Sequence, residues 1–465
     1  CDLPIALDAA LDEEGAVPVD RPPSLLLRER LLEGGDAQAL ASLVGRTELD
    51  GLLVDPEIAS DARRVDWLLR QGAHAEARIP GAPAPVQAAL ERGGQGIAVL
   101  RALFAHAGSP AGAGPLHLAA ALGREPALRR LIAAGAAPDR RAADGQTPLG
   151  VALAAGRRDL ADWLDWRGWR LPHRRLQPGD VPAAAMVGDT DAVRRLLDLG
   201  LPVDALDAQG CSALLRAAGG GHRALVELLL ARGADPGLAA NTGATPLSAA
   251  VSMRQAEIVE RLLEAGAGLD QRLPGEVTVL MLASALGLPE LVARLLHAGA
   301  DLHAHDAQRL TPLHCAALYG FTARDRVRLV ALLDTLLLAG ADPQQPAADG
   351  VTPLLLLLGA RAEAGTPSSE DVVLAGLERL LDEGVRLDAR DTRGFGPLHL
   401  AGLHGLLRVV QRLLREGADP NQRDTLNRTP REIALMRGYV DVAAELAPPN
   451  AGPPSVSMAR FLRDQ

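Results

Sequence analysis

The sequence Thr311-Pro312-Leu313-His314-Cys315-Ala316 recurs in weaker forms along most of this 465-residue chain. The copies are regularly spaced, because Pro115 and Pro148 lie 33 residues apart and the same interval separates Pro397 from Pro430. A fixed period of this length is typical of repeat proteins, in which each unit is one small supersecondary structure stacked on its neighbours. The positions that recur are Pro115, His117, Thr147, Pro148, Thr245, Pro246, Thr311, Pro312, His314, Thr352, Pro353, Pro397, His399, Thr429 and Pro430.

Degenerate copies fill the gaps between the clear ones and bring the total to about thirteen units. Two intervals are longer than the others, with 41 residues from Pro312 to Pro353 and 44 residues from Pro353 to Pro397. We therefore expect inserted loops near residues 321–328 and 361–371, which either bind a partner or are tolerated variation in length. The predicted starts lie near residues 23, 52, 85, 115, 148, 182, 213, 246, 279, 312, 353, 397 and 430.

Each unit is predicted to contain two short helices and an extended turn. A Thr hydroxyl can cap a helix N-terminus, and the Pro that follows fits the first helical position because its missing N–H would have no partner there. Ile258, Val259 and Leu262 have the spacing of one buried face on a second helix. Asp349-Gly350 suits a tight turn. The glycines predicted to end first helices are Gly123, Gly156, Gly188, Gly287, Gly320, Gly405 and Gly438.

The motif and its period resemble the ankyrin repeat family, over nearly the whole chain. The resemblance implies an elongated all-α solenoid of helix-turn-helix units with extended β-turn fingers, in which the motif histidines are structural hydrogen-bond bridges. On this interpretation residues 1–110 are degenerate ankyrin-like repeats and residues 111–447 are ankyrin repeats with two insertions. Residues 448–465 are a Pro-rich linker with a C-terminal cap or tail.

The implied function is a non-enzymatic scaffold that binds partner proteins through the concave surface of fingers and first helices. All 48 basic residues are Arg, and Tyr, Phe and Met are scarce, so a GC-rich bacterial genome would explain the composition. We therefore expect a bacterial ankyrin repeat protein. A lysine-free chain would also escape ubiquitination in a eukaryotic host, which would suit a host-directed effector as an alternative.

Charge and hydropathy limit the remaining classes of partner. A net charge of −10 without a long basic run argues against binding to nucleic acid. Nor does any apolar run approach the roughly 18 residues that a spanning helix needs, so we expect no transmembrane segment in this chain. Cys1 fits either a lipid-anchored lipoprotein that regulates an envelope protein or a fragment of a longer protein. Bacterial cytoplasm and cell envelope both remain open, and the chain could be the soluble portion of a larger membrane-associated protein.

Two groups of residues are candidates for partner binding. Trp and Arg are enriched at binding hot spots, and three of the four Trp residues lie close together in a basic segment. Alignment with the other repeats predicts that Trp163 is half-buried and Trp166 exposed. The alternative for this segment is a structural patch in which the three rings cover each other at a distorted junction. The second group precedes the motif in successive fingers. The candidates are Trp163, Trp166, Trp169, Arg167, Arg170 and Arg174 in the first group and Gln146, Gln209, Thr242, Arg309, Asp349 and Arg393 in the second.

Signatures of catalysis are weak in this sequence. A phosphate-binding loop would need a Lys that the chain lacks, and no G-x-S-x-G or Cys-x-x-Cys motif is present. His303 and His305 could ligate a metal, but they lie in a predicted finger with no fixed further ligands nearby. Cys211 and Cys315 lie in apolar patterns and are interpreted as small core residues. We therefore expect no catalytic residues, no cofactor and no metal.

Overall fold

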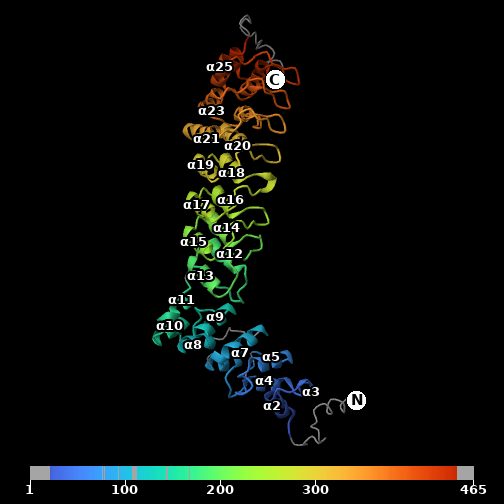
Figure 1. Cartoon of the computed structure of the whole chain (residues 1–465), viewed down its shortest axis with the longest axis vertical. Coiled ribbons are helices and arrows are strands. Elements are labelled where there is room, and N and C mark those ends of the chain that lie inside the picture. The colour runs from blue at the N-terminus through green and yellow to red at the C-terminus, as the bar shows by residue number, and fades with distance from the viewer. Residues whose placement is uncertain are drawn as a thin grey trace, which may run out of the picture. The chain divides into compact units, whose positions relative to one another are not determined.

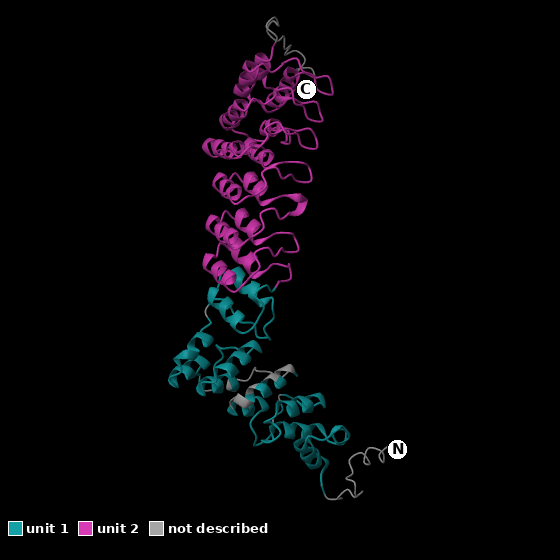
Figure 2. Ribbon diagram, in the orientation of Figure 1, with its two compact units in different colours: residues 1–205 teal, residues 206–465 magenta. Residues whose placement is uncertain are grey.

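The computed structural model describes residues 21–75, 77, 79–92, 94–106, 113–142, 145–166 and 168–447. Within these ranges the chain forms helices and loops without a β-strand, and two isolated bridges join Leu206 to Ser212 and Leu273 to Val277. The all-α fold class expected from the sequence is confirmed. The chain divides into two compact units, residues 1–205 and residues 206–465, which are described separately (Figure 2).

Unit 1 contains successive helix pairs around an apolar core that includes Leu68, Leu100, Leu128 and Leu131. Its helices are α2 (Pro23–Glu33), α3 (Gln38–Ala41), α4 (Arg46–Val54), α5 (Ala62–Arg70), α6 (Pro85–Glu91), α7 (Gly94–Ala105), α8 (Ala113–Ala121), α9 (Glu125–Ala133), α10 (Pro148–Ala154), the 3-10 turn η1 (Arg158–Leu160), α11 (Ala161–Leu164), α12 (Asp180–Val187) and α13 (Thr190–Asp198).

The repeat start expected near residue 52 is wrong. Leu52 lies in the last turn of α4, which begins at Arg46. The helix starts earlier because the Glu48 carboxylate accepts a hydrogen bond from the Gly45 N–H, at 3.1 Å, and so provides a cap that contains neither Thr nor Pro.

Unit 2 is a stack of helix pairs whose connecting fingers all project to the same side (Figure 1). Its helices are α14 (Ala213–Gly220), α15 (Arg223–Ala231), α16 (Pro246–Ser252), α17 (Ala256–Glu264), the 3-10 turn η2 (Pro274–Glu276), α18 (Val279–Ala285), α19 (Pro289–His297), α20 (Pro312–Thr322), α21 (Arg326–Leu338), α22 (Pro353–Leu357), α23 (Glu370–Asp382), α24 (Pro397–His404), α25 (Leu407–Arg415), α26 (Pro430–Met436) and α27 (Val440–Glu445).

The first helices of unit 2 begin where the motif predicts. The Thr245 hydroxyl accepts a hydrogen bond from the Ser248 N–H at 3.1 Å, and Thr429 caps α26 in the same way. The Leu after the first helical position is buried in each complete motif copy, as in Leu313 and Leu398. Burial of one such side chain contributes about 1.5–3 kcal/mol, so this position anchors each unit to its neighbours.

The two insertions differ from the expected pair of loops. Residues 321–328 do not form a loop, because α20 continues to Thr322 and α21 begins at Arg326. The extra residues lengthen α21 to 13 residues, compared with nine in α19, and Leu329, Leu333 and Leu336 on it are fully buried. The expected helix stop at Gly320 is wrong for the same reason, since this glycine lies inside α20. The second insertion is divided between the 13-residue helix α23 and a loop over residues 358–369.

His117 and His399 connect neighbouring repeats, as predicted for the motif histidines, whereas Nε2 of His314 is buried without a hydrogen-bond partner. Nε2 of His117 lies 3.0 Å from the Gln146 carbonyl oxygen, and Nε2 of His399 lies 3.2 Å from that of Arg428. His314 is fully buried, and its Nδ1 accepts a hydrogen bond from the Thr311 N–H at 3.2 Å. Burial lowers the pKa of His314 to about 4. The neutral imidazole is therefore the form that the fold accommodates.

We predict that His314 makes the stability of the protein depend on pH. Its ordinary pKa is 6.5, so below pH 6.5 the unfolded chain takes up a proton that the folded chain accepts only near pH 4. Stability present above pH 6.5 is lost as the pH falls towards 4, by about 3 kcal/mol from this group. In His314→Met, the free energy of unfolding, measured by urea titration at several pH values, should fall less steeply. Met281 occupies the equivalent position in α18, so Met is compatible with the site.

His303→Met, which removes an exposed histidine from a finger, is the matched control. Identical pH profiles for the parent and His314→Met would contradict the prediction.

Candidate functional site

An aspartate holds the backbone of several fingers in unit 2. The Asp424 carboxylate accepts hydrogen bonds from the N–H groups of Leu426, at 2.9 Å, and Arg428, at 2.7 Å. Its second oxygen pairs with the Arg428 guanidinium at 2.7 Å. Asp391 binds the N–H groups of Arg393 and Phe395 and pairs with the Arg393 side chain in the same manner. These carboxylates fix the turns of the fingers that carry them, whereas the equivalent positions in other fingers are Ala240, Leu273 and Ala347.

Two of the finger aspartates, Asp424 and Asp207, have a lowered pKa and are ionised in the folded protein near neutral pH. Burial opposes ionisation of Asp424, but the backbone N–H groups and the Arg428 guanidinium outweigh it and lower the pKa of this carboxyl. Asp207, paired with Arg216, has its pKa lowered by the same balance. The Asp–Arg pairs were not predicted from the sequence, although the Asp that stands five residues before Ser212, Gly396 and Thr429 was the available signal.

Neighbouring fingers are also joined through their backbones. The Asn241 N–H donates to the Gln209 carbonyl at 3.3 Å, and the Thr425 N–H donates to the Arg393 carbonyl at 3.0 Å. The Ala348 N–H reaches the Gln308 carbonyl at 2.9 Å. The fingers of unit 2 are therefore held at a fixed spacing by hydrogen bonds that leave most of their side chains to the solvent.

The predicted finger contacts fall into two classes. Gln146 in unit 1 and Gln209, Thr242 and Arg309 in unit 2 are exposed. Gln209 also accepts a hydrogen bond from the Arg216 guanidinium at 2.5 Å, and Asp349 and Arg393 have more extensive structural partners. Asp349 is half-buried and pairs with Arg361 at 2.9 Å. The Arg393 guanidinium pairs with Asp391, donates to the Ala360 carbonyl at 2.9 Å and lies 4.5 Å from the centre of the Phe395 ring.

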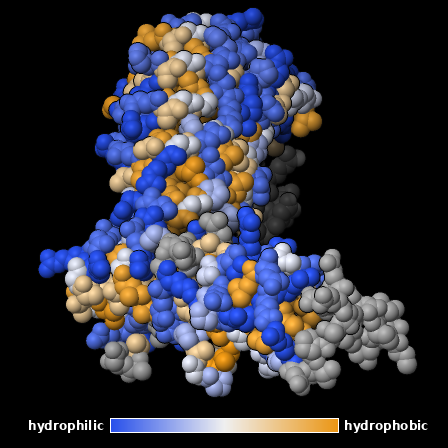
Figure 3. Space-filling view, turned by 60° about the horizontal axis from the view of Figure 1, so that its bottom comes forward, coloured by the Kyte–Doolittle hydropathy of each residue, from blue (hydrophilic) through white to orange (hydrophobic). Residues whose placement is uncertain are grey.

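First helices add apolar side chains beside the fingers. Six residues after the Pro that opens each helix stand Leu318 in α20, Leu403 in α24 and Met436 in α26. The equivalent positions in α16 and α18 carry the small residues Ser252 and Ala285. Large apolar residues are therefore concentrated towards the C-terminal repeats of unit 2. On the face drawn in Figure 3, apolar side chains form patches separated by hydrophilic ones.

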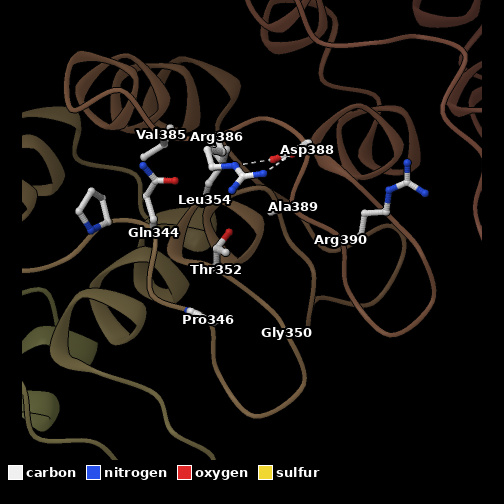
Figure 4. Close-up of a pocket in the computed structure, with 11 residues that line it drawn as sticks. Gln344, Pro346, Gly350, Thr352, Leu354, Val385, Arg386, Asp388, Ala389 and Arg390 are labelled. Atoms are coloured by element: carbon white, nitrogen blue, oxygen red, sulfur yellow. Dashed lines mark hydrogen bonds and ion pairs between the residues drawn. The ribbon is translucent and has the colours of Figure 1, made fainter.

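Two hollows lie against the fingers of the C-terminal repeats. The finger hollow, of about 340 Å³, lies between the finger around Gln344 and Gly350 and the segment Val385 to Arg390, where Arg386 pairs with Asp388 at 2.6 Å (Figure 4). The C-terminal groove is larger, at about 600 Å³. It is lined by Ala362, Glu363, Ala364, Arg393, Phe395, Leu403, Arg428, Ile433, Met436 and Arg437.

In unit 1 the tryptophan segment packs against two arginines of other helices, and the Arg195 guanidinium lies 5.1 Å from the centre of the Trp166 ring. Trp163 is 7% exposed, rather than half-buried as expected, and the Arg129 guanidinium covers its ring at 4.3 Å from the centre. Trp166 is half-buried rather than exposed. The second helix ends early at Leu164, so the chain turns and the Trp166 indole N–H donates to the Trp163 carbonyl at 2.7 Å. The Trp169 N–H donates to Asp189 at 2.8 Å.

The arginines of this segment have separate environments. Arg174 makes two hydrogen bonds, at 2.7 and 2.9 Å, to the buried Asp180 carboxylate. Arg170 is exposed. Arg167 lies outside the described residues, as do Cys1 and residues 448–465. The rings of Trp163 and Trp166 are thus covered by arginines from other helices rather than by each other, and partner binding by this segment stays a prediction.

The remaining predictions from the sequence concern metal ligands, the cysteines and membrane spans. His303 and His305 are exposed, and among the described residues no three His, Cys, Asp or Glu side chains gather as a metal site would require. Cys211 is buried directly before the N-cap Ser212 rather than inside a helix, and Cys315 lies in α20. No helix in the described ranges is long and apolar enough to span a membrane.

Three family models match separate parts of the chain. One, described as ankyrin repeats in three copies, matches residues 183–272, and two described as ankyrin repeats in many copies match residues 116–164 and 380–434. The chain carries ankyrin repeats. Its helix pairs, histidine bridges and fingers are thus those of ankyrin units.

Similar curated proteins are animal ankyrin repeat proteins. The ankyrin repeat and KH domain-containing protein mask-1 of Caenorhabditis elegans is 32% identical over 138 residues, which are 29% of this chain and 5% of that protein. The ankyrin repeat and SAM domain-containing protein 6 of Danio rerio is 35% identical over 156 residues, which cover 30% of this chain and 20% of that protein. The chain thus spans a small part of these relatives. Their animal origin gives the expected bacterial origin no support.

We predict that Asp424→Ala unfolds the last finger locally. The substitution leaves the N–H groups of Leu426 and Arg428 without their acceptor and the Arg428 guanidinium without its counter-ion, at a cost of about 2–3 kcal/mol. Hydrogen exchange of residues 424–428, followed by mass spectrometry, should accelerate accordingly. Asp388→Ala, which removes an exposed ion pair, is the control and should leave the exchange of residues 424–428 unchanged. Unchanged exchange in Asp424→Ala would show that the carboxylate does not hold the finger.

Proposed function

We propose that this chain is a non-enzymatic scaffold that binds partner proteins through its finger surface. We define the finger surface as the fingers of unit 2 together with the exposed residues of the adjoining first helices. The observation that carries the proposal is the fixed array of fingers, in which buried aspartates and backbone hydrogen bonds hold the loops while side chains such as Gln209, Thr242 and Arg309 remain exposed. A surface that is ordered before binding loses little conformational entropy when a partner binds.

The chemistry of the buried groups supports a non-catalytic role. Burial raises the pKa of the Cys315 thiol to about 12, so the reactive thiolate is scarce near neutral pH. The neighbouring His314 is kept neutral by its low pKa and already accepts a hydrogen bond from Thr311. This pair therefore lacks the charge state of a cysteine nucleophile activated by histidine.

The finer hypotheses on origin and anchoring rest on the sequence alone. A bacterial source would explain why Lys is absent and Tyr, Phe and Met are scarce, and a lysine-free chain would suit a host-directed role. The relatives that we compared are animal proteins. We keep protein binding as the proposed function and retain the effector and lipoprotein roles as hypotheses.

We predict that a finger-surface variant loses partners that a variant of the second helices keeps. Arg309→Glu with Leu318→Glu reverses a charge and removes an apolar contact on the finger surface. Arg415→Glu with Leu338→Glu makes the same chemical changes on α25 and α21, where Leu338 is 81% exposed. Affinity capture from cell extract, read by mass spectrometry, should recover partners with the parent and with the Arg415→Glu and Leu338→Glu control. The Arg309→Glu and Leu318→Glu variant should not recover them.

Circular dichroism would establish that both double variants are folded. Partners lost only with the α25 and α21 variant would place binding on the second helices and contradict the proposal. Failure of the parent to enrich any protein over a blank matrix would also count against it.

A further inference from the structure

The C-terminal groove combines an apolar floor with a basic rim. Phe395, Leu403 and Ile433 form the floor and are at most 7% exposed, whereas Met436 projects from α26 with 68% exposure. One wall is the loop over residues 358–369, which belongs to the second insertion and supplies Ala362, Glu363 and Ala364. An ordinary 33-residue unit has no such wall, so the groove is a product of the insertion.

Three guanidinium groups surround this floor. The side chains of Arg393 and Arg428 are 45% and 30% exposed, while their partners Asp391 and Asp424 are 4% and 0% exposed. A molecule in the groove therefore meets the cations and not the carboxylates that orient them. Both guanidinium groups also lie near the Phe395 ring, at 4.5 Å and 5.8 Å from its centre. They are thereby held at the edge of the floor.

Arg437 is the third group and differs from the other two. It is exposed next to Met436, and its guanidinium makes no hydrogen bond or ion pair within the described part of the chain. Glu363 is the single acidic residue that lines the groove. The groove therefore presents three guanidinium groups and one carboxylate to a bound molecule, while Asp391 and Asp424 behind the rim neutralise the charges of Arg393 and Arg428.

We propose that the C-terminal groove binds an extended segment of a partner protein that carries a carboxylate side chain next to a large apolar side chain. The apolar side chain packs on Phe395, Leu403 and Met436, and the carboxylate pairs with Arg437 and with the free N–H groups of Arg393 or Arg428. Arginine suits this role because its planar guanidinium can bind both oxygens of a carboxylate. The inference rests on the proposed function and specifies the chemistry of the partner.

Charge argues against the C-terminal tail of the chain as the occupant. Residues 458–464 include Met458, Phe461 and Leu462, which could fill an apolar floor, but Arg460 and Arg463 outweigh the single Asp464 and would bring a net positive charge to the rim. An acidic segment of another protein has the complementary charge.

Selection from a random library of 12-residue peptides displayed on phage tests the proposal with the full chain as bait. Peptides that combine Asp or Glu with Leu, Ile, Met or Phe should be enriched. Selected peptides, made synthetically with a fluorescent label, should bind Arg437→Glu at least tenfold more weakly than the parent in fluorescence polarisation. Met436→Ser should weaken binding without changing the preference for peptides that carry Asp or Glu. Both residues are exposed, so neither variant is expected to impair folding.

A charge swap provides the sharpest control. A peptide in which Lys replaces the acidic residue should bind Arg437→Glu better than it binds the parent, whereas Arg415→Glu on α25 should leave all affinities unchanged. Enrichment of peptides without acidic residues, or equal affinity for the parent and Arg437→Glu, would overturn the proposal. Peptides weakened by the Arg309→Glu and Leu318→Glu pair but not by Arg437→Glu would overturn this inference while leaving protein binding by the finger surface intact. If no peptide is enriched, this inference fails, and the capture experiment above decides the broader function independently.

Discussion

No helix pair in this chain can bury its own apolar face, and the fold follows from that constraint. In unit 2 the same Leu of successive motif copies, including Leu247, Leu280, Leu313 and Leu398, is at most 2% exposed because the next pair covers it. The stabilisation comes from nearest-neighbour contacts, so a change in one unit is felt mainly by the units beside it. Because each unit contacts mainly its neighbours, one repeat can gain residues without disrupting the packing of the repeats farther away.

Stacking also requires hydrogen-bond partners for backbone groups that it removes from water. When helix pairs pack at the short spacing that Ala and Leu permit, the fingers between them are brought close together and their backbone N–H groups lose access to water. The carboxylates of Asp391 and Asp424, the bridges from His117 and His399, and the carbonyl groups of adjacent fingers supply the missing partners. Buried polar groups of this kind must be paired, and pairing makes the fingers rigid. The fingers are thus rigid, as a binding surface should be, because their backbone groups need hydrogen-bond partners.

The two long units illustrate how local change becomes a new surface. Both carry a 13-residue second helix, and α21 and α23 pack together, with Arg379 of α23 paired to Asp334 of α21. Extra length in one unit is matched by extra length in the next, which keeps the helices side by side over their whole extent. The residues that do not fit into a helix, in the loop over residues 358–369, reach the fingers and become a wall of the C-terminal groove.

The sequence by itself determined the repeat, its 33-residue period and the position of most first helices, because Thr-Pro caps and apolar spacing act within a few residues. It also showed which two units carry insertions, because the intervals from Pro312 to Pro353 and from Pro353 to Pro397 exceed 33 residues. Only the tertiary structure decided that residues 321–328 extend helices, that Trp163 is buried beneath Arg129 and that Arg393 and Arg428 share one groove with Arg437. These outcomes depend on contacts between residues 30 or more positions apart, and no local pattern specifies which side chains such stacking brings together.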